Sequence, residues 1–410
     1  MSYAEHEEHL HKENVPNLRF PEFSGEWTKT TLGKIGETFN GLTGKSGSDF
    51  GQGSPYITYK SIFDNSKIDL SRVEYVTITD AERKKQTQNE VHYGDIFFTT
   101  SSETPDEVGM TSVLLDEVKD CYLNSFCFGY RLNSITDVLP EYMRFYLRSN
   151  TIRRRLFVLA QGSTRFNISK GEVMGLTIKL PGTAEQRKIA QLLTMIEDRI
   201  ATQIKIIEKL ESLIKGISNN LLYSESGTPV RLGDILSERL ERTKVNNQHE
   251  VLSSTVKGIF SQREYFSKDI ASENNVGYKI IRLHDVVLSP QNLWMGNINY
   301  NDKFDIGIVS PSYKIFSIAD SYDKRFVAAM LKTHRALFNY MLVSEQGASV
   351  VRRNLNMEAF EQLVFKMPSI DKQQEIGNAI SALQSRLELA VRTKTAYEKQ
   401  KQWLLTQMFI

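Results

Sequence analysis

Two stretches of the chain repeat apolar residues in the heptad pattern that is typical of long coiled-coil helices. In the first, residues 189–221, spacings of four and three residues alternate without a break. Thr183 followed by Gln186 predicts a capping box at the start of this helix, and Pro181 ends the strand before it. The seam consists of Ile189, Leu193, Ile196, Ile200, Gln203, Ile207, Leu210, Ile214, Ile217 and Leu221.

The second stretch, residues 376–408, keeps the same register but has lysines at two seam positions. Because these charges weaken a homodimer seam, we expect the two helices of one chain to pack antiparallel, with a globular body at each end of a rod. The alternative is two unrelated amphipathic helices, each packed on its own domain. The second seam consists of Ile376, Ile380, Leu383, Leu387, Ala390, Lys394, Tyr397, Lys401, Leu404 and Met408.

The chain also repeats itself with a period close to half its length. LPGTAEQRKIAQLLTMIEDRI at 180–200 matches MPSIDKQQEIGNAISALQSRL at 367–387 without a gap, so that Gln186 aligns with Gln373. Weaker pairs are TLGKIGE with RLGDILSE, GDIFFTTSSE with HDVVLSPQNLW, and AQGSTR with EQGASV. Each half therefore contains an LG(K/D)I entry, a variable body, a Gln-Gly (QG) loop and a helix that follows a proline.

The variable bodies have the composition of mixed α and β structure. Strand-like runs include DIFFTT, YLNSFCFGYRL and LTIKL in the first half and YKIIRL, DVVLSP and QLVFKM in the second. A helical stretch precedes each QG loop. We therefore predict an α+β fold with a pseudo-twofold internal repeat: a polar tail (1–24), a first domain (25–180), a long helix (181–223), a second domain (224–367) and a second long helix (368–410).

Composition adds few constraints. The net charge of +2 and the pI of about 8.3 indicate that any nucleic-acid surface is a local concentration of Lys and Arg. Cys121 and Cys127 fall on one face of a predicted strand as core thiols. With no disulfide framework, no apolar signal-peptide core and no membrane-length apolar run, a soluble protein of the reducing cytoplasm is expected. The tail holds His6, His9 and His11, which we interpret as solvated rather than as a metal site.

This organisation resembles the specificity subunit of Type I restriction–modification systems. The resemblance rests on NVPNLRFPEFSGEW with TLGKIGE, on RLGDI, on GDIFFTT and on the two helix starts, and it covers the chain except its acidic tail. It implies two target-recognition domains, one for each half-site of a split DNA sequence, joined by helices that act as a spacer. His284 stands where the GDI motif has Gly, which puts the turn geometry there in question.

Family membership also implies partners that carry the chemistry. Two modification subunits bind S-adenosylmethionine and methylate adenine, and restriction subunits that use ATP and Mg²⁺ translocate and cut DNA. This chain is then not an enzyme and holds no cofactor or metal.

Two loops in each half have side chains suited to DNA. The loop after the GDI-like strand and the QG loop supply amides, hydroxyls and a carboxylate that can contact base edges, and the Trp294 indole can stack on bases or act as a wedge. Lys and Arg suit phosphates. The candidates are Thr100, Ser101, Ser102, Glu103, Gln161, Ser163, Thr164 and Arg165 in the first half, Gln291, Asn292, Trp294, Gln346, Ser349, Arg352 and Arg353 in the second, and Lys45, Lys60 and Arg153–Arg155 for phosphates. For any one residue, an ordinary polar turn or a solvated helix face explains the sequence equally well.

Three fragments resemble catalytic motifs but are incomplete. GLTGKS lacks the first glycine of a P-loop, and SPSY at 310–313 has Ser312 in place of a proline of the adenine-methyltransferase motif. Asp106, Glu117 and Lys119 match the loose pattern of metal-dependent nucleases, which occurs often by chance. A metal-dependent nuclease and a non-DNA coiled-coil adaptor remain the alternative functions.

Overall fold

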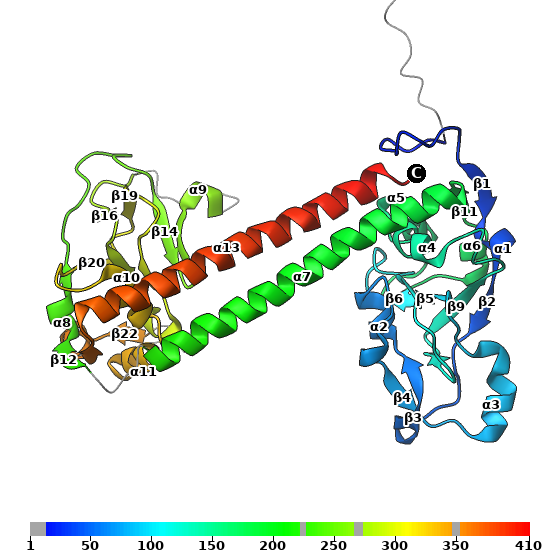
Figure 1. The fold of residues 1–410 in the computed structure, drawn as a ribbon, viewed down its shortest axis with the longest axis horizontal. Helices are drawn as coiled ribbons and strands as arrows, with labels where there is room; N and C mark the ends of the chain where they lie inside the picture. Colours follow the sequence, from blue (N-terminus) through cyan, green and yellow to red (C-terminus); the bar gives the residue numbers. More distant parts are fainter. Residues whose placement is uncertain (1–13, 222–226, 266–273, 347–352) are drawn as a thin grey trace, which may run out of the picture. The chain divides into compact units, whose positions relative to one another are not determined.

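The computed structural model describes residues 14–221, 227–265, 274–346 and 353–410 (Figure 1). The chain divides into two compact units, which we describe separately. Unit 1 contains the residues up to Thr202 together with Lys394–Ile410, and unit 2 is Gln203–Thr393. Each long helix, α7 (Thr183–Leu221) and α13 (Ile370–Gln407), therefore contributes one part to each unit.

Unit 1 is built on a four-stranded antiparallel sheet in the order β2-β9-β5-β7. These strands are β2 (Gly36–Asn40), β9 (Cys127–Leu132), β5 (Ile96–Thr99) and β7 (Thr111–Val113). The other strands are β4 (Glu74–Val76), β3 (Phe50–Ile57) and β8 (Tyr122–Leu123) in one sheet, and the pairs β1 (Thr28–Thr31) with β11 (Thr177–Leu180) and β6 (Ser101–Ser102) with β10 (Phe166–Asn167). The helices are α1 (Leu32–Ile35), α2 (Tyr59–Asp64), α3 (Asp80–Gln86), α4 (Pro140–Tyr146), α5 (Asn150–Leu159) and α6 (Lys170–Met174).

Unit 2 has a four-stranded sheet in the equivalent order, β13-β20-β17-β18, which confirms the internal repeat and the α+β fold class. These strands are β13 (Leu236–Glu238), β20 (Lys314–Ile318), β17 (Val286–Leu288) and β18 (Ile298–Tyr300). The strand pairs are β12 (Thr228–Arg231) with β23 (Val364–Met367), β14 (Leu252–Thr255) with β15 (Gly258–Ser261), β16 (Lys279–Arg282) with β19 (Ile306–Val309), and β21 (Ser344–Gln346) with β22 (Arg353–Leu355). The helices are α8 (Leu232–Ile235), α9 (Gln262–Tyr265), α10 (Lys324–Leu331), α11 (His334–Leu342) and α12 (Met357–Glu361).

The helical stretch predicted before each QG loop is two helices in each unit. Ser149 caps α5 through its hydroxyl, and Thr333 caps α11 in the same way. A capping hydroxyl satisfies a free backbone N–H and so favours a new helix start at that residue. The break lets α4 and α10 lie on the sheets while α5 and α11 lead into the QG loops.

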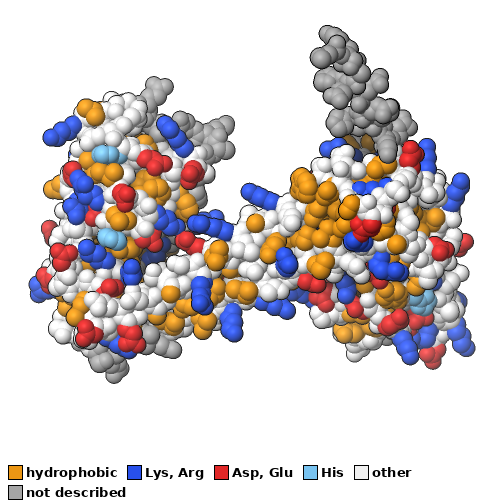
Figure 2. Space-filling model, turned by 45° about the horizontal axis from the view of Figure 1, so that its top comes forward, with side chains coloured by type: hydrophobic (Ala, Val, Ile, Leu, Met, Phe, Trp, Pro, Cys, Tyr) orange, Lys and Arg blue, Asp and Glu red, His pale blue; other side chains and the backbone are white. Residues whose placement is uncertain are grey.

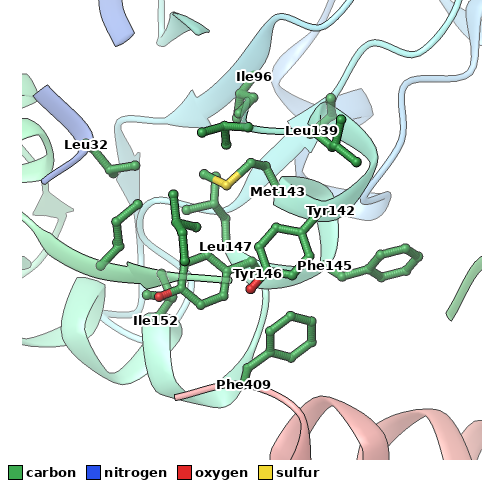
Figure 3. Packing of buried hydrophobic residues seen from close by; sticks show 14 of the residues in the cluster. Leu32, Ile96, Leu139, Tyr142, Met143, Phe145, Tyr146, Leu147, Ile152 and Phe409 are labelled. Atoms are coloured by element: carbon green, nitrogen blue, oxygen red, sulfur yellow. The ribbon is translucent and has the colours of Figure 1, made fainter. Parts of the chain in front are cut away.

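The core of unit 1 joins segments that are far apart in the sequence. Aromatic and aliphatic side chains of α4 and α5 pack on the buried face of β5 and β9. The residues that follow α13 complete this core, because the Phe409 ring lies 5.7 Å from the centroids of both Tyr142 and Tyr146 (Figure 3). In unit 2, residues of β17, α10, α11 and the start of α13 form the corresponding core.

The two predicted core cysteines are confirmed as free, buried thiols. They belong to a smaller apolar cluster of unit 1, and burial raises the pKa of Cys121 and of Cys127 to about 12. The run that contains them is not one strand, because it divides into β8 and β9 with a turn at Asn124–Phe126.

The heptad pattern is reproduced in the burial of the long helices. Ile189, Leu193 and Ile196 are buried in unit 1. Within unit 1 the two helices run antiparallel, since Glu197 accepts a hydrogen bond from Lys401 at 2.6 Å and the Arg199 guanidinium lies 5.6 Å from the centre of the Tyr397 ring. In unit 2, the seam positions of α7 from 203 to 217 are half-buried and most residues between them are exposed.

The capping box predicted at the start of α7 is wrong. The Thr183 hydroxyl donates to the Asp137 carbonyl at 3.3 Å instead of capping the helix. The Gln186 amide is buried, accepts from Leu139 N at 2.9 Å and donates to the Pro181 carbonyl at 2.9 Å. A capping box needs a free helix start, whereas here the start of α7 is packed against the N-terminus of α4.

Residues predicted to belong to the polar tail contact unit 1. Leu18 N donates to the Gln407 carbonyl at 2.9 Å, and Arg19 forms an ion pair with Glu185 at 2.7 Å. The three histidines of the tail lie outside the described residues.

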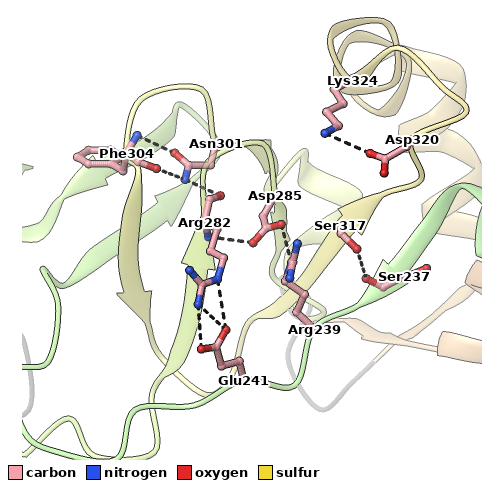
Figure 4. A network of polar contacts seen from close by, with 10 residues as sticks. All are labelled: Ser237, Arg239, Glu241, Arg282, Asp285, Asn301, Phe304, Ser317, Asp320 and Lys324. Atoms are coloured by element: carbon pink, nitrogen blue, oxygen red, sulfur yellow. Dashed lines mark hydrogen bonds and ion pairs between the residues drawn. The ribbon is translucent and has the colours of Figure 1, made fainter.

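The turn before β17 keeps the geometry of its counterpart although His replaces Gly. His284 has a φ of 73°, close to the 87° of Gly94. In both units the following aspartate accepts from a backbone N–H three residues earlier and from an arginine Nε, each at 2.8 Å. Asp285 does so with Arg282 and Arg239 (Figure 4), and Asp95 with His92 and Arg131. These carboxylate contacts hold the left-handed turn even when the residue at its tip has a side chain.

Candidate nucleic-acid interface

In unit 1 the two candidate loops are joined by a strand pair. β6, which follows the GDI strand, pairs with β10, which follows the QG loop, in the register Ser102 to Phe166 and Ser101 to Asn167. Arg165 Nε donates to Ser101 Oγ at 3.3 Å, so a QG-loop cation touches the β6 loop directly. The sequence therefore located two loops, and the structure combines them into one surface.

Some side chains of this surface are buried and bonded within the protein, and others are exposed to solvent. The hydroxyl of Thr100 donates to the Phe126 carbonyl at 2.6 Å, and that of Ser102 donates to Glu107 at 2.9 Å. Ser101 and Ser102 are buried, at 5% and 7% exposure, so they shape the loop and do not face a ligand. The exposed side chains of the predicted set are Glu103, Gln161, Ser163, Thr164 and Arg165.

The QG loop of unit 1 is a tight, backbone-bonded turn. Gln161 and Asn167 exchange two backbone hydrogen bonds at 2.9 and 2.8 Å. A Cβ on Gly162 would lie 2.1 Å from the Arg165 carbonyl oxygen, and its φ of 138° favours glycine, so only Gly fits. The Gln161 amide donates to Glu172 at 2.7 Å, which fixes the base of the turn and leaves Ser163, Thr164 and Arg165 at its tip.

In unit 2 the corresponding loops also meet. Arg353 N donates to the Gln291 carbonyl at 3.2 Å, and the Arg353 guanidinium lies 5.1 Å from the centre of the Trp294 ring, a cation–π geometry. Both side chains are half-buried. Trp294 Nε1 and Arg353 Nε are buried and have no hydrogen-bond partner within the described residues.

The remaining candidates of unit 2 are less defined. Gln291 is exposed and Asn292 half-buried beside η4 (Leu293–Met295). Gln346 ends β21 and pairs with Arg353 across the ladder. Ser349 and Arg352 lie outside the described residues.

Most cations predicted to bind phosphate have internal partners. The Lys45 ammonium is paired with Glu82 at 2.7 Å, its side chain is 7% exposed, and this hydrogen bond lowers the pKa of Glu82 to about 2. Arg153 donates to the carbonyls of Asp106, Val108 and Gly109, and burial lowers its pKa to about 10. Phosphate contacts predicted for these residues, and for Arg155, which donates to Thr177 O at 2.6 Å, do not fit this arrangement. Lys60 and Arg154 are exposed.

Charges of both signs are mixed on the face shown in Figure 2, which is consistent with the small net charge. On this face no single sign of charge dominates, so exposed cations next to the loops, such as Arg165, are the candidates for phosphate attraction.

Two contributors to the unit 1 surface were missed at the level of sequence. The Tyr59 hydroxyl donates to the Ser101 carbonyl at 2.7 Å, and the turn at Asn124–Phe126 carries the carbonyl that Thr100 binds. The Asn-Ser pair inside YLNSFCFGYRL is a turn signal that could have divided this run. Nothing in the sequence singled out Tyr59.

The motifs that resembled catalytic sites form turns. Gly44 has a φ of 78° and precedes a turn that Ser46 caps with Asp49, and SPSY connects β19 to β20. Among the described residues, no group of three or more His, Cys, Asp or Glu side chains is arranged to hold a metal ion. No helix in the described ranges has the length and hydropathy to cross a membrane.

Comparison with known proteins identifies proteins that are similar to this chain in sequence and in structure. Residues 24–212 match the family model described as Type I restriction modification DNA specificity domain. The chain is 22% identical over 420 residues to a putative type I restriction enzyme MjaX specificity subunit of Methanocaldococcus jannaschii, with 96% of this chain and 95% of that protein covered. The crystal structure of a Type-I restriction-modification system S subunit from M. genitalium superposes with a TM-score of 0.62 at 14% identity, covering 97% of this chain and 99% of that chain, so it shares the fold.

Proposed function

The chain belongs to the Type I restriction–modification DNA specificity subunits, and from this premise we propose that its two units read the two half-sites of one bipartite DNA target. One observation carries the proposal. Both units join the loop after a central strand to the loop after a helix pair, but the side chains at the two tips differ. A shared scaffold with different tips is suited to reading two different half-sites in the same way.

In this proposal the tips supply base contacts. In unit 1 these are Glu103, Ser163, Thr164 and Arg165, while Gln161 holds the base of the turn through Glu172 and Lys60 contributes a phosphate contact. In unit 2 they are Gln291, Asn292, Trp294, Gln346, Ser349, Arg352 and Arg353. Arg and amide side chains can bind guanine and adenine in the major groove, and a carboxylate can accept from cytosine. Thr100, Ser101 and Ser102 set the loop geometry, and Lys45 stabilises the fold through its ion pair with Glu82.

We propose that the partners are double-stranded DNA, two modification subunits that bind S-adenosylmethionine, and restriction subunits that use ATP and Mg²⁺. The chain itself holds no cofactor and contributes recognition only. We accordingly expect the purified chain to neither methylate nor cut DNA. Cleavage that Asp106→Ala abolishes would favour the nuclease alternative instead.

An exchange of recognition bodies tests the function directly. Residues 230–366 are replaced by the matching body of a related subunit, and methylated adenines are mapped in cells that also contain the modification partner. We expect one half-site to change and the other to stay. The reciprocal exchange of residues 25–180 serves as the control and should change only the other half-site. A change of both half-sites in either exchange contradicts the two-reader proposal.

A further inference from the structure

An exposed phenylalanine stands beside the base-reading loop of unit 1. Phe126 is 64% exposed, more than Phe157 at 47% or Tyr75 at 45%. It lies in the turn between β8 and β9, and the Phe126 carbonyl accepts from both Thr100 N at 3.2 Å and Thr100 Oγ1 at 2.6 Å. The ring is thus attached, through its own backbone, to the residue that begins the loop.

The turn that carries this ring is fixed. The Asn124 side chain accepts from Phe126 N at 2.8 Å, Cys127 N donates to the Asn124 carbonyl at 3.1 Å, and Asn124 N donates to the Ile57 carbonyl at 2.9 Å. Cys127, the next residue, is buried. The backbone therefore holds a large apolar side chain in water, although burial of such a side chain is favourable. Because the backbone of the turn is already ordered, contact through this exposed ring costs little further backbone entropy.

Comparison of the two units indicates which contact this is. The ladders pair Phe98 with Phe128 in unit 1 and Leu288 with Lys314 in unit 2, so the position of Phe126 corresponds to Ser312. In unit 2 the aromatic side chain lies instead on the other loop, as Trp294. Features that both units share indicate a role in the scaffold or in binding a common partner. An aromatic ring whose position differs between the units indicates instead a role in recognising what differs between the two half-sites.

We propose that Phe126 is a wedge side chain that packs against a base step of the DNA half-site read by unit 1. The inference rests on the proposed function and extends it to a residue outside the predicted set. Apolar side chains can separate stacked bases, and the exposed polar side chains of the adjoining loop, such as Glu103, would contact the base edges. A ring contact is not electrostatic, so it adds affinity without adding to the salt dependence of binding.

The test uses the chain in complex with its modification partner and duplexes that carry 2-aminopurine, which brightens when it unstacks, in one half-site or the other. Phe126→Ala, Phe126→Leu and the control Phe338→Ala, which truncates a 56% exposed phenylalanine in unit 2, are compared with the unsubstituted chain. Thermal unfolding of each chain verifies the fold, which should be unchanged because the side chain is exposed.

The unsubstituted complex is expected to brighten the probe in the half-site of unit 1. Phe126→Ala should abolish this signal and weaken binding about tenfold, in the range of one base–aromatic contact, with the slope against salt unchanged. Phe126→Leu should retain part of the signal, because leucine can also act as a wedge. Phe338→Ala should retain all of it.

A Phe126→Ala complex with unchanged affinity and signal overturns the inference, as does loss of complex assembly instead of DNA contact, which would make the ring a protein contact. Both outcomes leave the proposed function intact. By contrast, failure of the unsubstituted complex to bind a bipartite target with sequence preference contradicts the proposed function itself.

Discussion

Gln186 and Gln373 make the same pair of hydrogen bonds in the two units. Each side chain is buried and donates to the carbonyl of a proline five residues earlier, Pro181 at 2.9 Å and Pro368 at 2.8 Å. Each also accepts from the backbone N–H that precedes a helix on the sheet, Leu139 N at 2.9 Å and Asp323 N at 3.0 Å. The amide therefore couples the start of a long helix to the recognition body.

We predict that Gln373→Leu destabilises unit 2. The substitution keeps the side-chain volume but leaves the part-buried Asp323 N–H and Pro368 carbonyl without this partner, and an unsatisfied polar group costs up to about 1–3 kcal/mol when fully buried. Gln374→Leu, at an exposed neighbouring position, is the matched control and should change the unfolding free energy by less than about 0.5 kcal/mol. Urea unfolding of both variants measures the difference, and equal midpoints would show that the amide is not a structural coupling.

A second prediction concerns the turn before the central strand. Gly94→Ala should destabilise unit 1 by about 1–2 kcal/mol, since a left-handed φ of 87° disfavours a Cβ, which would also lie 3.2 Å from Pro140 and Ile135 carbons. His284→Gly in unit 2 should be nearly neutral. It relieves the left-handed strain but removes the 2.6 Å hydrogen bond to the Tyr300 hydroxyl.

Thermal unfolding of these two variants decides the point. A large loss of stability in His284→Gly would show that the imidazole contact, and not the aspartate contacts alone, holds this turn in unit 2. No loss in Gly94→Ala would contradict the argument from left-handed strain.

The turn also shows what the sequence could and could not predict. The repeat was visible because scaffold residues such as Gln186 and Gln373 align, and the long helices were visible because a heptad seam is a strong periodic signal. The roles of those residues were not, since Gln186 bonds to Leu139, which no local pattern reveals. Similarly, Lys45 and Arg153 are residue types that often bind phosphate. Here the Lys45 ammonium is paired with Glu82, and the Arg153 guanidinium donates to backbone carbonyls of a distant loop. The two candidate loops of unit 1 were located from the sequence, but their pairing through β6 and β10 depends on tertiary contacts. Contact of these loops with DNA stays a prediction.

A third prediction concerns pH. Lys401 interrupts the second seam, and burial, assisted by Arg144 and Arg148, lowers its pKa from 10.5 to about 8. The folded chain then releases this proton at a lower pH than the unfolded chain. Between these values the unfolded state binds more protons, so the stability of unit 1 should rise as the pH increases from about 8 to about 10.5.

Lys401→Met should remove this rise, because the group that titrates is gone. The control is Lys399→Met, an exposed lysine on the same helix, which should keep it. Urea midpoints of unit 1 at several pH values measure the slope. If the stability of the unsubstituted chain does not rise over this range relative to that of Lys401→Met, the ammonium is not held in a destabilising environment.

The last prediction tests the two recognition surfaces separately, by substituting one arginine in each. Arg165 touches Ser101 at the tip of unit 1, and Arg353 lies over Trp294 at the tip of unit 2. If each reads one half-site, Arg165→Ala should relax base preference in the first half-site only, and Arg353→Ala in the second only. Loss of one specific arginine contact costs about 1–3 kcal/mol of discrimination. Each variant is the control for the other, because both remove one guanidinium and leave the chain with the same net charge. The readout is the methylation rate on a set of duplexes that vary one position at a time in each half-site. An equal loss on all duplexes, with a shallower dependence on salt, would instead assign both arginines to backbone phosphates, since a phosphate contact weakens binding to every sequence alike.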